Sequence, residues 1–139
     1  MERHRNRLEL YVHAVWKTSR GRPLISAVIE PSVIRAIATK SLQLRCPPCA
    51  VGGTSDHMHM LARLHPSVSV ARLVGEVKGA SSHLVTHDLG VAFFRWQSGY
   101  GAFTISTEDV PAVERYVLNQ KQHHAFGGLE PTFEPVDWF

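Results

Sequence analysis

The stretch that decides the fold is residues 55–64, which read SDHMHMLARL. Side chains of a β-strand point alternately to its two faces, so residues two apart share a face. One face of a strand here would be apolar and buried, formed by Met58, Met60, Ala62 and Leu64. His57 and His59 would point together from the other face, where two neutral imidazoles can bind one divalent cation. For so short a motif the alternative is two histidines that face solvent or a polar pocket.

The composition is that of one globular domain. The chain has 139 residues, which predicts a single domain over residues 1–139 with room for one good core. Hydrophobic residues make up 44% and charged residues 19%, which excludes a disordered chain. The net charge of +3 permits a nucleic-acid partner without establishing one. No leader-like segment or long apolar run is present, so we expect a cytoplasmic protein that does not contact the membrane.

The two cysteines, Cys46 and Cys49, do not predict a functional site. A structural zinc site needs four ligands, and the chain has no second C-x-x-C pair. A thioredoxin-like pair would open a helix, whereas this pair precedes an apolar stretch that is typical of a strand. Free thiols instead suit a reducing cytoplasm.

The order of predicted elements is that of an α+β protein. Apolar periodicity predicts strands at residues 8–17, 44–53 and 56–64, and a fourth in the second half of 93–106. Helices are expected at residues 26–42, from a Ser67 or Ser69 cap to Val85, and at 108–124. This is the ferredoxin-like βαββαβ plan, an antiparallel sheet with two helices on one face, followed by a third helix. We expect the third helix to pack on the free face, where the histidines point.

The last predicted helix supplies the second half of a possible site. Tyr116 and Gln120 are four residues apart and therefore lie on one helical face, flanked by Val113 and Val117. Alone, such a tyrosine is usually a packing residue with a satisfied hydroxyl. Together with two histidines the set makes chemical sense, because a metal held by two imidazoles and an amide oxygen keeps positions open for a phosphate oxygen. A tyrosine hydroxyl one turn away can then attack the phosphorus.

These motifs resemble the single-tyrosine HUH transposases. That family comprises the transposases of the smallest single-strand insertion sequences and their domesticated relatives associated with repetitive extragenic palindromes (REP). The resemblance covers nearly the whole chain, through the segments VHAVWKTSRGRPLI, GGTSDHMHMLARLHPSVSVARLVGEVKGASSHL, FRWQSGYGAF and VERYVLNQKQHH. Its specific parts are His-hydrophobe-His within TSDHMHML and the Y-x-x-N-Q helix.

The resemblance implies a metal-dependent endonuclease and strand transferase that acts on single-stranded DNA beside hairpins. His57, His59 and Gln120 correspond to the metal ligands, with Asn119 as a neighbouring candidate, and Tyr116 corresponds to the nucleophile. The implied metal is Mg²⁺ or Mn²⁺, the implied intermediate is a 5′-phosphotyrosine, and the implied assembly is a homodimer. Such an enzyme would work in the bacterial cytoplasm beside the nucleoid.

Two other functions remain possible from the sequence. One is a ferredoxin-like module that binds single-stranded nucleic acid on stacked aromatic residues without cleaving it. The other is a small metal-binding or regulatory dimer, which would need neither Tyr116 nor DNA. The candidate DNA contacts are Arg20, Arg22, Arg63 and Lys78. His83 and His87 have the spacing of a helical metal pair but lack the acidic residue of H-E-x-x-H, so we interpret them as surface residues.

Overall fold

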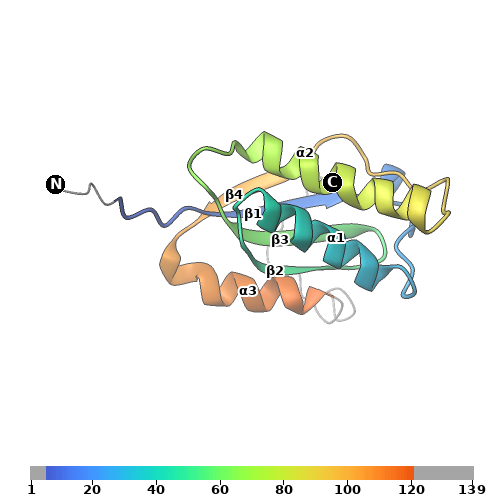
Figure 1. Cartoon of the computed structure of the whole chain (residues 1–139). Coiled ribbons are helices and arrows are strands. Elements are labelled where there is room, and N and C mark those ends of the chain that lie inside the picture. Colours follow the sequence, from blue (N-terminus) through green and yellow to red (C-terminus); the bar gives the residue numbers. More distant parts are fainter. Residues whose placement is uncertain (1–5, 121–139) are drawn as a thin grey trace.

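The fold is a four-stranded antiparallel sheet between two helical layers. The computed structural model describes residues 6–120. The strands are β1 (Tyr11–Lys17), β2 (Pro48–Gly53), β3 (His57–Arg63) and β4 (Gly101–Ile105), in the spatial order β2-β3-β1-β4. The main helices are α1 (Glu30–Gln43), α2 (Val70–His83) and α3 (Val110–Leu118). Figure 1 shows α1 and α2 on one side of the sheet and α3 on the other, which confirms the predicted ferredoxin-like plan with its extra helix.

Short helical turns connect these elements. They are η1 (Ser19–Gly21) after β1, the π-helical turn η2 (Leu84–Asp88) after α2, and η3 (Thr107–Asp109) before α3. Among the described residues no helix is both long enough and apolar enough to cross a membrane.

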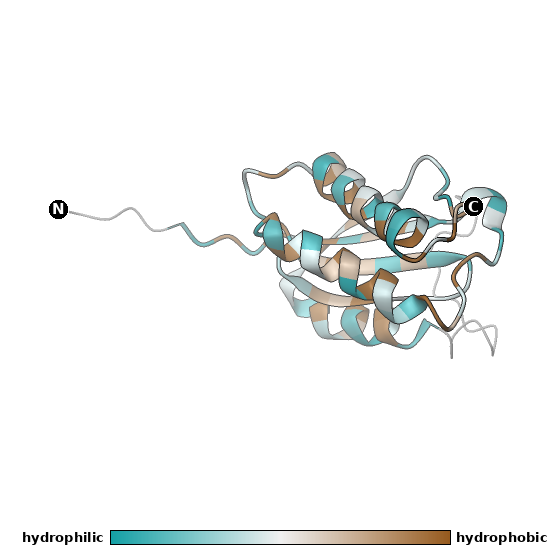
Figure 2. Ribbon diagram, turned by 45° about the vertical axis from the view of Figure 1, so that its right-hand side comes forward, coloured by the Kyte–Doolittle hydropathy of each residue, from teal (hydrophilic) through white to brown (hydrophobic). Residues whose placement is uncertain are grey.

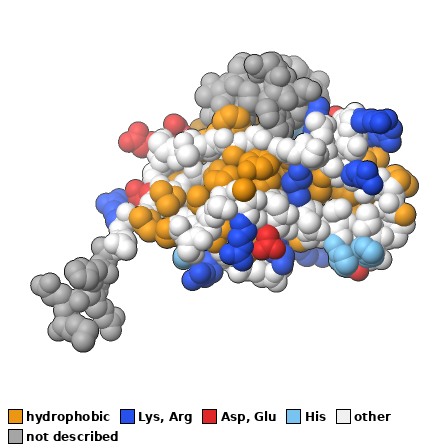
Figure 3. All heavy atoms as spheres, turned by 90° about the horizontal axis from the view of Figure 1, so that it is seen from above, with side chains coloured by type: hydrophobic (Ala, Val, Ile, Leu, Met, Phe, Trp, Pro, Cys, Tyr) orange, Lys and Arg blue, Asp and Glu red, His pale blue; other side chains and the backbone are white. Residues whose placement is uncertain are grey.

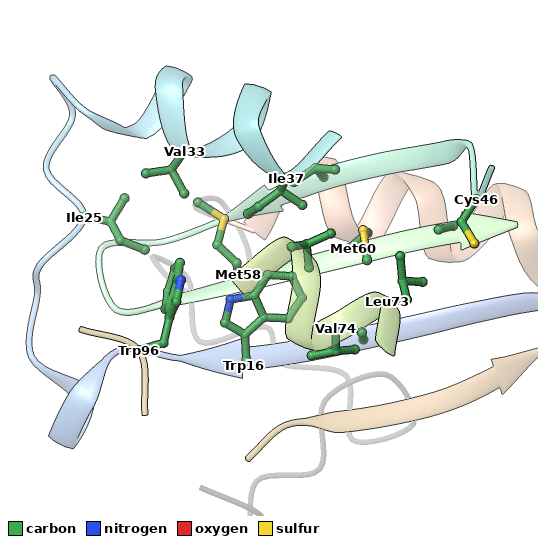
Figure 4. Close-up of a cluster of buried hydrophobic side chains, with 14 of the residues drawn as sticks. Trp16, Ile25, Val33, Ile37, Cys46, Met58, Met60, Leu73, Val74 and Trp96 are labelled. Atoms are coloured by element: carbon green, nitrogen blue, oxygen red, sulfur yellow. The ribbon is translucent and has the colours of Figure 1, made fainter. Parts of the chain in front are cut away.

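The larger core lies between the sheet and the pair α1 and α2. Met58 and Met60 of β3 and Trp16 of β1 are fully buried there, as the period-two pattern predicts (Figure 4). Val33 and Ile37 of α1 and Leu73 and Val74 of α2 pack against them. In Figure 2 the hydrophobic residues of these helices form stripes among hydrophilic ones, as amphipathic helices over a sheet require.

A smaller core holds α3 on the opposite face of the sheet. Val113 and Val117 of α3 are fully buried against Leu61 of β3 and Ala50 of β2. The two valines are four residues apart, so they form one stripe on the helix. The third helix therefore packs where the sequence predicted it, over the half of the sheet that carries His57 and His59.

Several predicted boundaries were wrong by a few residues, for local backbone reasons. The first helix begins at Glu30 and not at residue 26, because Pro31 occupies its first turn and residues 27–29 form a preceding turn. The second strand begins at Pro48 and not at residue 44, because Arg45 takes a left-handed conformation, with φ of 62°, after α1 ends. The part of the predicted last helix beyond residue 120 lies outside the described residues.

Candidate active site

His57 stands at the start of β3, where a neighbouring carboxylate orients its ring. Its Nδ1 lies 2.7 Å from Oδ1 of Asp56 and 2.9 Å from the Thr54 hydroxyl, which itself donates to the same carboxylate oxygen at 3.0 Å. A carboxylate only accepts hydrogen bonds, so the proton of a neutral His57 resides on Nδ1. This leaves the lone pair on Nε2, the nitrogen that points toward α3.

His59 is oriented in the same sense by a third histidine, His13 of β1. The Nδ1 of His59 lies 2.8 Å from Nε2 of His13, and both side chains are fully buried. The two rings stack at 5.0 Å between centroids. When His59 donates its Nδ1 proton to His13, its Nε2 has the lone pair that a metal requires. Metal-binding histidines are commonly held by such a hydrogen bond from the other ring nitrogen.

The end of α3 brings Tyr116 and Gln120 against these histidines. The Tyr116 ring is only 3% exposed and meets the His59 ring edge-on at 5.8 Å. Gln120 lies two residues beyond α3, and its Nε2 donates to the Tyr116 carbonyl at 2.9 Å. That bond aims the amide oxygen at His57, with 3.4 Å between Oε1 and Nε2. A bound cation, or a proton on Nε2, would satisfy both of these facing atoms.

The donor set suits a cation with imidazole and amide-oxygen ligands. The candidate ligand atoms are the Nε2 atoms of His57 and His59, whose Nδ1 atoms have the contacts described above, and the Oε1 of Gln120, which faces His57. Within residues 6–120 no three His, Cys, Asp or Glu side chains gather as a metal site, so the amide would have to complete this one. The sequence predicted these three ligands, and the structure brings all of them and Tyr116 together.

A glycine allows α3 to approach this closely. Gly52 of β2 lies opposite His59 in the strand register. A Cβ atom on Gly52 would lie closer to the backbone carbonyl oxygen of Val117 than real Cβ contacts come. Since the obstacle is helix backbone, no side-chain rotation could relieve it. The helix therefore sits directly on the β2 backbone, one residue from Tyr116.

Sequence reasoning missed four members of the site. They are His13, Thr54, Asp56 and Gly52. Asp56 and Thr54 could have been suspected, because they directly precede His57 in a turn. His13 carries no such local signal, because only the register of β1 against β3 brings it beside His59.

Other residues considered from the sequence have structural roles. Burial, with a smaller effect from Glu114, raises the pKa of the Cys49 thiol, so it is a poor nucleophile at neutral pH. Lys78 donates to the backbone carbonyls of Gln97 and Gly99, and burial lowers its pKa. Arg63 donates to the carbonyl of Leu8. Both cations therefore have a role in the fold, and their candidacy as DNA contacts stays a prediction.

His83 and His87 lie apart from the site. Both are exposed and their rings stack at 4.3 Å. This agrees with their interpretation as surface residues.

Comparison with known proteins identifies the family of this chain. The family described as Transposase IS200 like matches residues 6–120. The transposases for insertion sequence element IS200 from Salmonella typhimurium and Salmonella typhi are each 28% identical over 79 residues. That alignment covers 52% of this chain and 51% of each relative, so it spans about half the length of the curated relatives.

Two solved structures share the fold. A candidate transposase from Deinococcus radiodurans R1 superposes with a TM-score of 0.66 at 18% identity, over 86% of this chain and 98% of that one. A REP-associated tyrosine transposase bound to a REP hairpin gives a TM-score of 0.60 at 18% identity, over 93% of this chain and 76% of that one. With the family match over most of its length, the chain belongs to the IS200-like transposase family.

Proposed function

We propose that the protein is a DNA transposase that cleaves and rejoins single-stranded DNA through a covalent phosphotyrosine. The observation that carries the proposal is the position of Tyr116 and Gln120 against His57 and His59. Two elements far apart in the sequence thereby place one potential nucleophile beside one potential metal site. Family membership supports the same activity.

The proposed metal ligands are His57, His59 and Gln120, and the proposed ion is Mg²⁺ or Mn²⁺. A bound divalent cation would polarise a phosphoryl oxygen and stabilise the charge that develops during displacement. The protein's part is to hold the ligands ready. Asp56 and His13 keep the Nδ1 atoms engaged, and the Tyr116 carbonyl orients the Gln120 amide. Such outer contacts fix both the tautomer and the ring orientation.

In the proposed chemistry the Tyr116 oxygen attacks the scissile phosphorus in line. A bond forms between this oxygen and phosphorus, and the bond from phosphorus to the 3′-oxygen breaks. The phenolic proton is lost to solvent or a base, and the departing 3′-oxygen gains a proton to become a free hydroxyl. The phosphotyrosine conserves the energy of the phosphodiester, so the 3′-hydroxyl of another strand can attack it and release Tyr116.

The proposed substrate is single-stranded DNA with hairpin or palindromic ends, in the cytoplasm beside the nucleoid. The neighbour whose structure contains a REP hairpin supports this substrate class.

The test is a library of 5′- and 3′-labelled hairpin oligonucleotides with randomised flanks, incubated with protein and Mn²⁺. We expect the 3′ label to transfer to the protein and the 5′ label to leave on a strand with a free 3′-hydroxyl. A protein that retains hairpins without cleaving any would be a binding module instead.

Loss of the His13 contact should weaken metal binding more than it affects chemistry. His13→Leu keeps most of the volume but removes the partner of His59 Nδ1. Loss of such a contact typically costs 10–100-fold in metal affinity or activity. We expect the Mn²⁺ concentration for half-maximal adduct formation to rise by about that factor, with partial recovery at saturating metal. His13→Gln should restore part of the affinity, and an exposed control, His87→Leu, should change nothing.

A side chain at Gly52 should displace α3 and slow adduct formation. The Cβ of Gly52→Ala would collide with the Val117 carbonyl, so the helix that carries Tyr116 must move away from His59. A misplacement of about 1 Å at a reacting group can cost about a hundredfold in rate. Gly75→Ala in α2 is the matched control, because nothing lies within 4 Å of its added Cβ. Equal single-turnover rates for the two variants would contradict the role of Gly52.

We also propose that the protein is a homodimer, on the basis of the family resemblance. Sedimentation at micromolar concentration should then give twice the chain mass. Because α3 packs on its own sheet, each site would be complete within one chain. We therefore expect a mixture of Tyr116→Phe and His57→Ala proteins to form no adduct. Recovery of adduct formation in the mixture would mean that the two chains exchange α3.

A further inference from the structure

A basic pocket lies beyond the end of β1, outside the site described above. Its volume is about 300 Å³. The lining residues come from two segments, residues 19–24 and 92–95. They are Ser19, Arg20, Arg22, Leu24, Ala92, Phe93, Phe94 and Arg95. None of these lining residues is acidic. Figure 3 shows several Lys and Arg side chains at the right-hand end of the molecule, the end toward which β1 runs in Figure 1.

Three arginines in this pocket are available to an anionic ligand. The side chains of Arg20, Arg22 and Arg95 are exposed and, within residues 6–120, have no hydrogen-bond or acidic partner. This distinguishes them from Arg63 and Lys78, whose charged groups bind backbone carbonyls. Three unpaired guanidinium groups around one pocket form an attractive site for phosphates.

An aromatic side chain accompanies the charges. Phe93 is 74% exposed, although the next residue, Phe94, is only 3% exposed and packs edge-on against Trp96 at 4.9 Å. The buried neighbour anchors the loop, and the exposed ring faces solvent at the pocket. Exposed aromatic rings beside basic groups are how proteins stack and hold the bases of single strands.

Backbone contacts hold the two loops together. The Ser19 N–H donates to the Arg95 carbonyl at 2.8 Å, and the Gln97 N–H donates to the Lys17 carbonyl at 2.9 Å. Thr18 and Trp96 form an isolated β-bridge between the same loops. Arg20 itself has a left-handed backbone, with φ of 57°. The arginines and Phe93 are thus presented on a fixed frame, which reduces the entropy lost on binding.

The pocket is close to the proposed catalytic centre along the chain. Lys17 lies opposite His57 in the strand register, and the Thr18 N–H donates to the Asp56 carbonyl at 2.8 Å. Arg20 is three residues beyond Lys17, so at most about 10 Å of backbone separates them. That distance is the length of about three stacked nucleotides.

We propose that this pocket binds a nucleotide of the single-stranded DNA that leads away from the scissile phosphate. Its base stacks on Phe93, and Arg20, Arg22 and Arg95 bind the adjoining phosphates. The inference rests on the proposed function, since it assigns a second contact to the same substrate. It concerns binding and not cleavage, so it can be tested without catalysis.

The test measures binding of two fluorescent probes to the Tyr116→Phe protein, which cannot form an adduct. One probe is the thymidine 12-mer, about the length of one single-strand site, and the other is a 12-mer of abasic residues with the same phosphates. We expect Phe93→Ala to weaken thymidine binding about tenfold and leave abasic binding unchanged, because only a base can stack. Phe93→Trp should bind thymidine at least as well as the parent.

The arginine contribution is measured with the triple variant Arg20→Gln, Arg22→Gln, Arg95→Gln. It should weaken both probes and lower the slope of log affinity against log salt by about two, or ~0.7 for each lost phosphate contact. Leu42→Ala and Arg35→Gln, exposed positions on α1, are the matched controls. The proposal is overturned if Phe93→Ala and the triple variant behave like these controls, or if the parent binds neither probe. If the parent and the variants bind the probes as expected but the parent never cleaves hairpin DNA, only the catalytic proposal is overturned.

Discussion

Tyr116→Phe is expected to abolish covalent adduct formation at every metal concentration. The hydroxyl is the atom that would attack phosphorus, and phenylalanine has no replacement for it. The ring would remain in its buried position beside His59, so packing of α3 is preserved. The free energy of unfolding should fall by about 1 kcal/mol at most, the worth of one hydrogen bond. Hairpin binding should therefore equal that of the parent.

The measurement is a denaturing gel of labelled oligonucleotide with parent and variant proteins in Mn²⁺. Tyr100→Phe is a suitable control, since Tyr100 packs at the edge of the other core. Cleavage that persists in Tyr116→Phe would rule out the single-tyrosine mechanism. A metal-activated water would then become the attacking group.

Replacing both His57 and His59 by alanine should remove metal-dependent activity almost entirely. A catalytic metal contributes several kcal/mol to the transition state, so adduct formation should fall by about a thousandfold or more. Mn²⁺ binding, followed by electron paramagnetic resonance, should be lost in parallel. The matched control is the double variant His83→Ala, His87→Ala, which removes two stacked but exposed histidines.

The same double variant must be checked for folding, because the structure changes one expectation. The alternation of residues 55–64 puts His57 and His59 off the apolar face, which by itself predicts a fold that tolerates their loss. They do lie outside the larger core, but α3 covers them, and they are 5% and 0% exposed. The double variant His57→Leu, His59→Leu, which keeps most of the volume but has no ligating atom, is the second test. A folded leucine variant that still binds Mn²⁺ like the parent would contradict the assignment as ligands.

Local patterns were sufficient to predict the fold and the faces on which the candidate site residues lie. The alternation in residues 55–64 separates Met58 and Met60 from His57 and His59, and the structure places the pairs on opposite faces. The spacing of Val113 and Val117 likewise predicts the buried stripe of α3. Such periodicities depend only on backbone geometry, so they can be recognised without tertiary information.

Features that depend on contacts between distant segments could not be predicted. The pairing of His13 with His59 requires the register of two strands that are 46 residues apart. The need for glycine at position 52 arises only when α3 lies on β2. The sequence also does not show which arginines bond to the backbone. Arg63 donates to the Leu8 carbonyl, whereas Arg20 has no such bond within residues 6–120. From the sequence the two arginines are equal candidates for DNA contact, and only their contacts in the structure distinguish them.

The most direct measurement of the central claim is the mass of the covalent peptide. Trypsin should cleave after Arg115 and Lys121, which releases Tyr116 in the peptide YVLNQK. After reaction with a hairpin and Mn²⁺, this peptide should carry the 5′-phosphate of the downstream DNA fragment. The chain has three tyrosines, Tyr11, Tyr100 and Tyr116, so the attachment site is unambiguous. DNA attached to Tyr11 or Tyr100, or cleavage with no attached peptide, would contradict the account.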